Sequence, residues 1–348
     1  MKDLVVLITG CGSPGAYGTI KSLRANRERE IRIVGIDVDP LVANRYFVDQ
    51  FHIPPNRTNP EFLGYVLDLA RRENANVVYP VPTAELEMFA LARTQFEAQG
   101  QRVVVSSPQS LAIANNKARL FKKVSEARLS CAPRYRVVHS WNEFVAAAQE
   151  LGYPDQRVCI KPSFGTGSKG FRILDAYISR LDLLVNALPT STYTSVEELA
   201  AVLRPANPFP EFVVMEYLPG DEYDVDVLAW KGESMSIIPR RNERMWYGLS
   251  LVSRADPNAA IMEFSRQVVA TLDLSYVVSL SFRMNSDGYA KLIEVNPRIP
   301  GSIIAATMAG VNMPYLAVKL ALGEHVSIPP VRWKTQMTRY WEEMFQFP

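Results

Sequence analysis

The 348-residue chain has few residues of the kinds that bind zinc or form disulfides, with only three cysteines and three histidines. Cys11, Cys131 and Cys159 are far apart and include no Cys-x-x-Cys pair, so we expect three reduced, buried thiols. The histidines are equally scattered, which argues against a zinc site. No apolar run approaches the ~20 residues of a membrane helix, and the first run, 4–8, is too short for a signal peptide. These absences predict a cytoplasmic protein that does not bind membranes.

The chain also lacks an excess of charge of either sign. Its 38 Lys and Arg against 36 Asp and Glu give a formal net charge of +2. Basic residues form no stripe interleaved with aromatic residues, so we expect no nucleic-acid partner. A composition of 48% hydrophobic and 21% charged residues is that of an ordinary globular protein. The length is enough for two or three domains.

Strands and helices alternate in the first third of the chain. Strands are predicted at 4–8, 31–36, 77–81 and 103–105, and helices from the glycine-rich turn 10–15 to Ala25, at 61–73 and at 85–99. This alternation predicts a parallel sheet with helices on both faces.

The remainder mixes helices with strands that are not separated by helices. Strands are predicted at 134–138, 157–161, 212–217, 223–230, 276–285 and 289–295, and helices at 117–126, 140–150, 257–272 and 302–322. The strands 212–217 and 223–230 are predicted to lie in one antiparallel sheet, and 276–285 and 289–295 to pair as a hairpin.

The most informative stretch is Glu294-Val295-Asn296-Pro297-Arg298, which closes a predicted strand. Alternate side chains of a strand share a face, so Glu294, Asn296 and Arg298 would project together. A carboxylate, an amide oxygen and a guanidinium on one face suit Mg²⁺ and the phosphates that accompany it. The alternative is a strand that ends in a polar turn, because Asn-Pro is a common turn dipeptide.

A second signal is Lys161, which ends a predicted strand and is followed by a loop dense in glycine and serine, 163–170. Glycines let backbone N–H groups approach phosphate oxygens, and small hydroxyls add donors. Lys161 would supply a point charge to the α- and β-phosphates. The lysine precedes the glycines, so this is not the P-loop pattern. The alternative is a flexible surface loop.

A third signal is the segment 215–226, in which an apolar strand ends in Glu216-Tyr217-Leu218 before a Pro-Gly turn. The backbone at the end of this strand is placed to pair with an adenine edge. Glu222, just beyond the turn, is placed to accept both ribose hydroxyls. The alternative is an ordinary hairpin with acidic, solvated positions.

Together and in this order, the three motifs resemble the ATP-grasp superfamily, and the chain is similar to one ATP-grasp half of the carbamoyl phosphate synthetase large subunit. The resemblance covers nearly the whole chain, and its specific parts are the Lys161 loop and residues 294–298. It implies an α/β and α+β protein. A Rossmann-like pre-ATP-grasp domain at 1–112 would precede a small ATP-grasp lobe with a glycine-rich lid and helical insertion at 113–211 and a large lobe with the metal site at 212–348.

The resemblance also implies roles for individual residues, with ATP as nucleotide and Mg²⁺ or Mn²⁺ as metal. Glu294 and Asn296 would hold the metal, and Arg298 would contact the γ-phosphate. Arg241 and Arg244 would reach phosphate or the acyl intermediate, although their run of basic residues is equally typical of a solvated face. The nucleotide ligands would be Lys117, Lys161, Gly165, Thr166, Gly167, Ser168, Glu216, Tyr217, Leu218 and Glu222.

One position departs from the family's pattern. A Glu, Gln, Asp or Asn commonly lies on the strand before Glu294 and bridges the metals, whereas Ser281 occupies that position here. A neutral hydroxyl is a weaker magnesium ligand than a carboxylate. Water or another acid, such as Asp226, would have to complete the site, or catalysis would be impaired.

The turn Gly10-Cys11-Gly12-Ser13-Pro14-Gly15 matches the G-x-G-x-x-G fingerprint of dinucleotide-binding folds, and Asp37 ends the second strand where those folds place a ribose-binding acid. Taken alone, this pattern favours NAD. An NAD enzyme would, however, leave the Lys161 loop and Glu294 unexplained. In ATP-grasp proteins similar to this one, the glycine turn faces the substrate cleft.

Two further positions keep two interpretations each. Glu85, which follows the strand 77–81, is placed to hold a substrate amine, or is an early-helix acid favoured by the helix dipole. Trp246-Tyr247-Gly248 would line an acceptor pocket or pack beside the sheet.

These features predict an ATP-dependent, ADP-forming carboxylate–amine ligase that acts through an acyl phosphate. Its partners would be a small carboxylate, with amino acids among the candidates, and an amine or ammonia; the resemblance also implies a homodimer. No side-chain nucleophile is required, which fits the absence of a Ser-His or Cys-His arrangement. Two other classes stay open: an ATP-binding protein with weakened or lost catalysis, and an NAD-dependent oxidoreductase.

Overall fold

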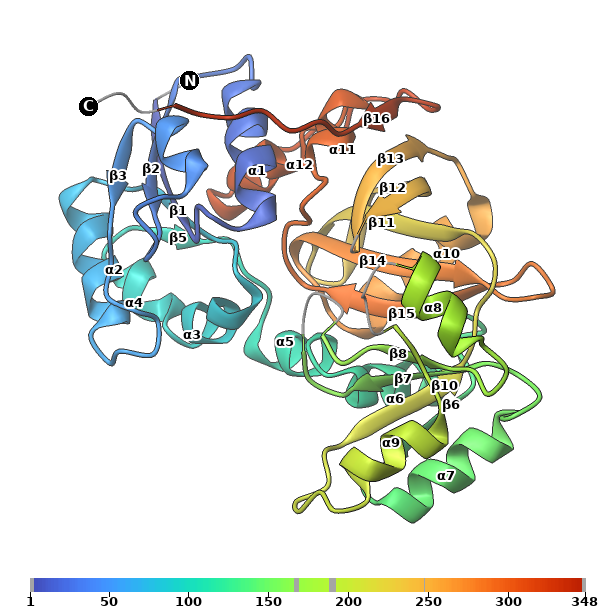
Figure 1. The fold of residues 1–348 in the computed structure, drawn as a ribbon. Helices are drawn as coiled ribbons and strands as arrows, with labels where there is room; N and C mark the ends of the chain where they lie inside the picture. Colours follow the sequence, from blue (N-terminus) through green and yellow to red (C-terminus); the bar gives the residue numbers. More distant parts are fainter. Residues whose placement is uncertain (1–2, 166–168, 188–191, 247, 346–348) are drawn as a thin grey trace. The chain divides into compact units, whose positions relative to one another are not determined.

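A computed structural model describes residues 3–165, 169–187, 192–246 and 248–345. The chain folds as two compact units (Figure 1). The first unit contains Met1–Ala114, Glu222–Ser281 and Val295–Pro348, and the second contains Asn115–Asp221 and Phe282–Glu294. These units cut across the predicted ranges 1–112, 113–211 and 212–348. Within the described ranges, every helix is too short or too polar to cross a membrane.

A parallel five-stranded sheet forms the N-terminal part of the first unit, as the alternating pattern predicts, and its strand order is β3-β2-β1-β4-β5. Its strands are Leu4–Thr9 (β1), Ile31–Ile36 (β2), Gln50–His52 (β3), Val77–Pro80 (β4) and Arg102–Val103 (β5). The helical elements are Pro14–Arg24 (α1), Ala43–Tyr46 (η1), Phe62–Arg72 (α2), Thr83–Glu85 (η2), Leu86–Leu91 (α3), Arg93–Ala98 (α4) and Pro108–Ala114 (α5). The sequence did not predict β3, because three half-exposed residues are too few for a periodic signal.

The two faces of this sheet carry separate apolar layers. Alternate residues of β1 point to opposite faces, so Val6 packs with Leu23 of α1, whereas Leu7 packs with Leu69 of α2. Figure 1 shows α1 on one side of the sheet and α2, α3 and α4 on the other. Full burial of each such aliphatic side chain contributes about 1.5–3 kcal/mol. Because these strands are parallel, their carboxyl ends lie at one edge of the sheet. The glycine turn 10–15 lies at this edge.

An antiparallel six-stranded sheet has the order β15-β14-β11-β12-β13-β16. Its strands are Glu222–Trp230 (β11), Glu233–Trp246 (β12), Leu249–Ala255 (β13), Tyr276–Met284 (β14), Ala290–Asn296 (β15) and Gln336–Thr338 (β16), and its helices are Ala259–Thr271 (α10), Ile304–Met308 (α11) and Met313–Ala321 (α12). The neighbours β14 and β15 confirm the predicted hairpin, and each has residues in both units. The sequence did not predict β12, because Pro239 and a basic run interrupt its apolar pattern.

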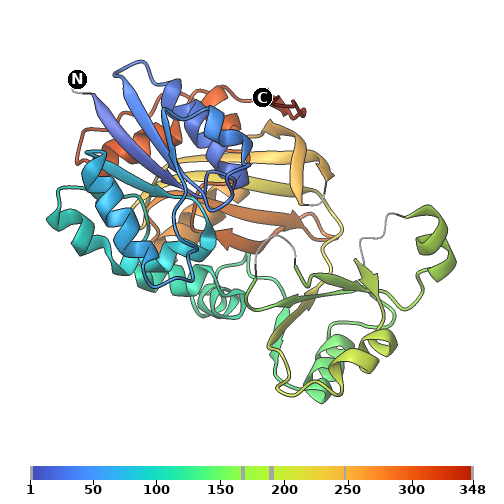
Figure 2. The same ribbon diagram turned by 60° about the vertical axis from the view of Figure 1, so that its left-hand side comes forward.

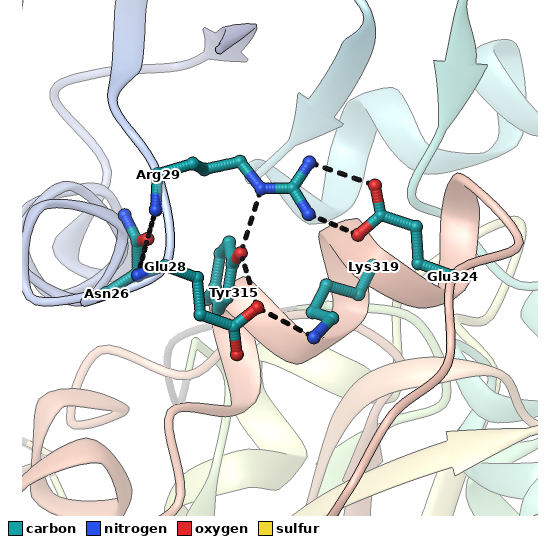
Figure 3. Close-up of polar contacts among 6 residues, drawn as sticks. All are labelled: Asn26, Glu28, Arg29, Tyr315, Lys319 and Glu324. Carbon is teal, nitrogen blue, oxygen red and sulfur yellow. Dashed lines mark hydrogen bonds and ion pairs between the residues drawn. The ribbon is translucent and has the colours of Figure 1, made fainter. Parts of the chain in front are cut away.

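Charged residues that precede β2 fasten α12 to the N-terminal part of the first unit (Figure 3). The guanidinium of Arg29 donates to both carboxylate oxygens of Glu324, and its Nε donates to the Tyr315 Oη at 3.0 Å. Glu28 accepts from the Tyr315 hydroxyl at 3.1 Å and from the Lys319 Nζ at 2.7 Å, and this ammonium lowers the pKa of Glu28. The Arg29 side chain is buried, and a buried charge requires its partner.

The second unit is built on a five-stranded sheet of order β6-β10-β7-β8-β9. Its strands are Tyr135–Val138 (β6), Val158–Pro162 (β7), Arg172–Leu174 (β8), Tyr193–Thr194 (β9) and Phe212–Glu216 (β10), and its helices are Lys117–Glu126 (α6), Trp141–Glu150 (α7), Arg180–Asn186 (α8) and Val196–Leu203 (α9). Helices α7 and α9 cover one face of this sheet (Figure 2), where Phe144 and Leu203 pack with Val158 and Val214.

One prediction about the sheets is wrong. The strand 212–217, seen as β10, pairs with β6 and β7 in the second unit, whereas the strand 223–230, seen as β11, pairs with β12 in the other sheet. The segment 215–226 is therefore not a hairpin, and that alternative is excluded. The periodicity of an apolar strand indicates which face is buried, but it does not indicate which strand lies beside it.

Candidate functional site

The Lys161 loop begins at the end of β7, as predicted. The Lys161 Nζ donates to the carbonyl of Ile293 at 3.2 Å and lies 5.7 Å from the ring centroid of Phe171. Gly170 has φ +74°, and a Cβ there would lie 2.5 Å from the Pro162 Cγ, so only glycine fits. Three of the predicted phosphate ligands, Thr166, Gly167 and Ser168, lie outside the described residues.

Helix α6 brings a second lysine to the same place. Asn116 caps the helix by accepting from the Arg119 N–H at 2.9 Å, and the Lys117 Nζ donates to the Gly165 carbonyl at 2.9 Å. Burial lowers the pKa of Lys117, while the nearby Glu294 carboxylate acts in the opposite direction. Two lysine ammonium groups therefore lie beside residues 293–294 of β15.

A narrow apolar hollow in the second unit lies next to these lysines. Its lining includes Cys159, Phe171, Leu218 and Ile293. Burial raises the pKa of Cys159 to about 11, so its thiol is neutral. All three cysteines are free and buried, as predicted. The hollow encloses only about 40 Å³, so a purine base enters only if lining side chains such as Phe171 move.

The predicted adenine segment lines this hollow. The Glu216 carboxylate accepts from the Arg134 backbone N–H at 2.8 Å and from its Nε at 3.2 Å, so this side chain is held by the protein. Tyr217 lies 5.6 Å beneath the Arg157 guanidinium. Leu218 is buried, and its backbone N–H has no hydrogen-bond acceptor among the described residues. An unsatisfied buried donor is rare, so it points to a ligand or water at this edge. Glu222 is the first residue of β11, in the first unit.

Asn296 is the last residue of β15, Arg298 lies in the bend after it, and their side chains contact each other. Arg298 donates through Nη2 to the Asn296 Oδ1 at 3.4 Å, through Nε to the Thr83 Oγ1 at 3.2 Å and through Nη1 to the Ile299 carbonyl at 2.9 Å. Glu294 lies two residues earlier in the same strand and on the same side of it. No cluster of three or more His, Cys, Asp or Glu side chains of metal-binding geometry occurs in the part of the chain that the structure describes.

The structure corrects the expectation about the acid that would accompany Ser281. Asp226 is 0% exposed and is paired with Arg240, so it does not substitute. The Ser281 hydroxyl instead donates to the Oδ1 of Asp224 at 3.0 Å, and the Oδ2 of Asp224 accepts from the Asn242 Nδ2 at 3.1 Å. Asp224 is partly exposed. The alternating Asp-Val-Asp-Val pattern of β11 could have indicated both acids, but not which of them is buried.

Neighbouring arginines of the basic run in β12 lie on opposite sides of the strand. Arg240 is 1% exposed and donates to Asp226 at 2.8 and 3.2 Å, to the Ser302 Oγ at 2.6 Å and to the Ser253 Oγ at 3.1 Å. Arg241, the next residue, points to the opposite side of the strand, and both Arg241 and Arg244 are exposed. Arg241 also lines an open cavity of about 360 Å³, together with Arg254 and Lys334.

Glu85 is buried at the N-terminus of α3, a position compatible with both interpretations given for it. It closes η2 and is 7% exposed, and its Oε2 accepts from the Thr9 Oγ1 at 2.5 Å. Burial raises its pKa to about 7; Asp37 adds to this increase, and Thr9 and Arg57 oppose it. The segment 246–248 was the other position with two interpretations. Trp246 is exposed, and the centroid of its ring lies 5.4 Å from that of Trp341. Tyr247 lies outside the described residues.

The glycine turn is filled by the protein's own atoms. A Cβ on Gly12 would lie 2.7 Å from the Val42 Cγ1, and one on Gly15 would lie 2.8 Å from the Ile299 Cγ2. The Oδ2 of Asp37 accepts from the Gly12 N–H at 2.6 Å. The fingerprint therefore serves close packing against residues after β15, which weakens the argument for NAD. Sequence reasoning assigned no role to four residues of these sites: Thr83, Arg57, Asp224 and Arg240.

Three family models match successive parts of the chain. A model described as the PylC-like N-terminal domain matches residues 6–104, and the carbamoyl-phosphate synthase L chain ATP-binding domain matches 116–203. A model described as ATP-grasp in the biosynthetic pathway with Ter operon matches 208–344.

Curated relatives include carbamoyl phosphate synthase large chains. That of Kocuria rhizophila is 22% identical over 337 residues, which cover 91% of this chain and 28% of the relative. That of Methanothermobacter thermautotrophicus is 21% identical over 341 residues, with 88% and 28% covered. The chain thus spans little more than a quarter of the length of these relatives.

Solved structures share the fold. The biotin carboxylase domain of Hydrogenobacter thermophilus 2-oxoglutarate carboxylase, solved with MgADP and bicarbonate, has a TM-score of 0.67 and 18% identity, with 95% of this chain and 73% of that chain covered. The L-amino acid ligase of Bacillus licheniformis has a TM-score of 0.61 and 17% identity, with 92% and 74% covered. The family models and the relatives show that the chain belongs to the ATP-grasp superfamily, and the solved structures share its fold.

Proposed function

We propose that the protein is an ATP-dependent, ADP-forming carboxylate–amine ligase that acts through an acyl phosphate. The observation that carries this proposal is the gathering of Lys117 and Lys161 beside the part of β15 that holds Glu294. Two ammonium groups next to a carboxylate suit the triphosphate of ATP with a divalent cation.

Residues of the second unit would bind the phosphates and the base of the nucleotide. Lys117 and Lys161 would contact the phosphates, and the backbone of residues 216–218 would pair with the adenine edge. The buried Leu218 N–H without an acceptor among the described residues supports this role. Glu222 would accept the ribose hydroxyls, and Phe171 would move to admit the base.

The donors of Glu294 and Asn296 fit Mg²⁺ or Mn²⁺, because both are hard oxygen ligands. When bound, the cation supplies charge neutralisation at the transferring phosphoryl group. Ser281 and Asp224 form a hydrogen-bonded hydroxyl–carboxylate pair that would support the binding of this cation. Arg298 is held by Thr83 and Asn296, which fixes its guanidinium for contact with the γ-phosphate.

In the proposed reaction, a substrate carboxylate attacks the γ-phosphorus and ADP leaves. Arg298 stabilises the charge on the transferring phosphoryl group. An amine or ammonia then attacks the acyl carbon, and inorganic phosphate leaves with the C–O bonding electrons. Arg241 and Arg244, exposed on β12, would interact with the phosphate or the acyl intermediate.

The substrates would be a small carboxylate and an amine, with amino acids as leading candidates. The similar fold of an L-amino acid ligase supports this substrate class. A homodimer is proposed because the Hydrogenobacter domain, of similar fold, is described as a dimer. Light scattering of the purified chain tests the assembly, and a monomer mass at working concentration would contradict it.

Phosphate release from ATP and Mg²⁺ across a panel of amino acids and small carboxylates tests the function. We expect release that depends on a carboxylate and an amine together, and its loss in Glu294→Gln. Glu233→Gln is the matched control, because Glu233 is an exposed acid at the start of β12. Loss of activity in the control as well, or full activity in Glu294→Gln, would contradict the assignment.

A second candidate is an ATP-binding protein with weakened or lost catalysis, favoured by Ser281 at the usual third-ligand position. Calorimetric titration with ATP and Mg²⁺ distinguishes the two. Binding without release for any pair in the panel would favour this candidate.

A further inference from the structure

A cavity of about 220 Å³ lies at the carboxyl ends of β1, β2 and β4. The adjacent strands β1 and β4 are where the order β3-β2-β1-β4-β5 reverses direction along the chain. Open α/β sheets bind their ligands at such a point, because the loops after neighbouring strands diverge there. The cavity lining includes Gly10, Asp37, Arg57 and Glu85.

The carboxyl group of Glu85 is half satisfied. Its Oε2 accepts from Thr9, but its Oε1 has no hydrogen-bond donor among the residues that the structure describes. Glu85 is 7% exposed, so this oxygen belongs to a buried side chain that lines the cavity. This oxygen is not among the buried side-chain atoms that lack a partner, so it is accessible from the cavity, where a donor from a ligand would bind it.

Two other charges line the same cavity. Asp37 interacts repulsively with Glu85, and Arg57 interacts attractively with it, so both lie close to it. Arg57 is exposed and makes no hydrogen bond or ion pair with any described residue. Two carboxyl groups beside a guanidinium complement a molecule that carries an ammonium and a carboxylate.

The cavity is tied to the proposed reaction centre through η2. Thr83, at the start of this turn, accepts from Arg298, and Glu85 closes the turn and lines the cavity. A ligand of the cavity is therefore separated from the Arg298 contact by one helical turn of backbone.

We propose that this cavity binds the amine substrate as an α-amino acid, with its ammonium held by Glu85 and Asp37 and its carboxylate by Arg57. Glu85 accepts one proton from the ammonium and becomes a neutral acid. The freed amine lone pair forms the C–N bond, the acyl C–O bond breaks, phosphate leaves with that electron pair, and the second proton of the nitrogen passes to the departing phosphate. This inference rests on the proposed ligase function for its chemical step, but not for binding.

The pKa of Glu85, raised to about 7, is consistent with this role. A general base works best when its pKa lies near the working pH. The raised value also means that the carboxyl group loses its proton when a cationic ligand enters, because a positive charge favours the ionised form.

The first arm of the test measures binding without ATP. Calorimetry of the full chain with each proteinogenic amino acid, and with its decarboxylated amine, is compared for wild type, Glu85→Gln and Arg57→Ala. We expect at least a tenfold loss of amino-acid affinity in both variants, and no effect of Arg57→Ala on the decarboxylated amines. Glu87→Gln and Arg27→Ala are the matched controls, because both residues are exposed and neither lines the cavity. Unchanged affinity in both variants, or binding to neither wild type nor variants, overturns the proposal.

The second arm measures ADP formation with hydroxylamine, a small neutral nucleophile that traps acyl phosphates. We expect Glu85→Gln to keep the wild-type rate with hydroxylamine and to lose most of the rate with the amino acid. Equal losses with both nucleophiles overturn the role of Glu85 toward the amine. If the wild type forms no ADP, the ligase function fails, and the binding arm alone decides what the cavity holds.

Discussion

The buried pair of Arg240 and Asp226 allows a quantitative prediction. Both side chains are essentially inaccessible, at 1% and 0% exposed, and Arg240 bridges Asp226 to Ser253 and Ser302. Replacing Arg240 by Met leaves a carboxylate without a counter-ion in an apolar interior. Removal of one partner of such a pair costs about 3–5 kcal/mol. We expect a similar loss for Asp226→Asn, which leaves the guanidinium without its charge partner.

The double variant Asp226→Leu with Arg240→Met removes both charges. Buried ion pairs replaced by apolar residues of similar size are often close to neutral in stability. The double variant should therefore be more stable than either single variant, with a coupling free energy of at least about 2 kcal/mol. Urea unfolding followed by tryptophan fluorescence and by far-UV circular dichroism measures these differences, and coincident transitions support a two-state treatment.

Single substitutions that each lose less than about 1 kcal/mol would refute this reasoning. They would mean that water reaches the pair and that the interior around β11 and β12 is not dry. Arg266→Met is the matched control, because Arg266 forms an exposed pair with Glu263 within α10. Exposed pairs contribute about 0–1 kcal/mol, so the control should change little.

Three further predictions concern packing, protonation and nucleotide binding. Gly15→Ala should lower stability by about 1–3 kcal/mol, because its Cβ would lie 3.0 Å from the backbone oxygen of Ile299; thermal unfolding measures this against Gly64→Ala in α2. The pKa of Glu85 is raised from 4.5 to about 7, so the folded state keeps the proton to a higher pH than the unfolded state does. The free energy of unfolding of the wild type should therefore fall by about 3 kcal/mol, relative to that of Glu85→Gln, as the pH rises from 4.5 to 7. Lys161→Met should weaken ATP binding at least tenfold, or about 1.4 kcal/mol, as calorimetry would measure.

Each of these has an outcome that contradicts it. Gly64 has no atom within 4 Å of an added Cβ, so an equal loss in Gly64→Ala would show that close packing is not the cause. A constant stability difference between wild type and Glu85→Gln from pH 4 to 8 would exclude the raised pKa. ATP affinity that falls equally in Lys122→Met, an exposed lysine of α6, would remove the specific role of Lys161.

The sequence was most informative where a local pattern determines the structure. The helix Lys117–Glu126 was predicted at both ends, because its apolar residues recur at helical spacing and Ala132-Pro133 interrupts the pattern that follows. The parallel order of β1, β2 and β4 followed from alternation alone. The contact of Asn296 with Arg298 was expected from strand geometry, but Arg298 lies in a bend after the end of β15.

Sequence failed where distant residues decide. Whether Asp224 or Asp226 is buried depends on Arg240, which lies on another strand and has no distinguishing neighbour in sequence. The partners of β10 come from strands before it, so its pairing with β11 was wrongly predicted. The sequence did not indicate the burial of Glu85, and its hydrogen-bond partner Thr9 lies 76 positions earlier in the chain.

The hydrogen bonds and ion pairs that join Glu28 and Arg29 to α12 mean that the N-terminal sheet depends on the C-terminal part of the chain for its stability. Ile303 and Tyr315 belong to the same apolar core as Val6, so the cover that α1 gives to this face of the sheet is completed only after most of the chain has been synthesised. A fragment ending at residue 114 would present that face to solvent and aggregate. A chimera that exchanges this sheet with a relative's must therefore carry residues 299–324 from the same parent.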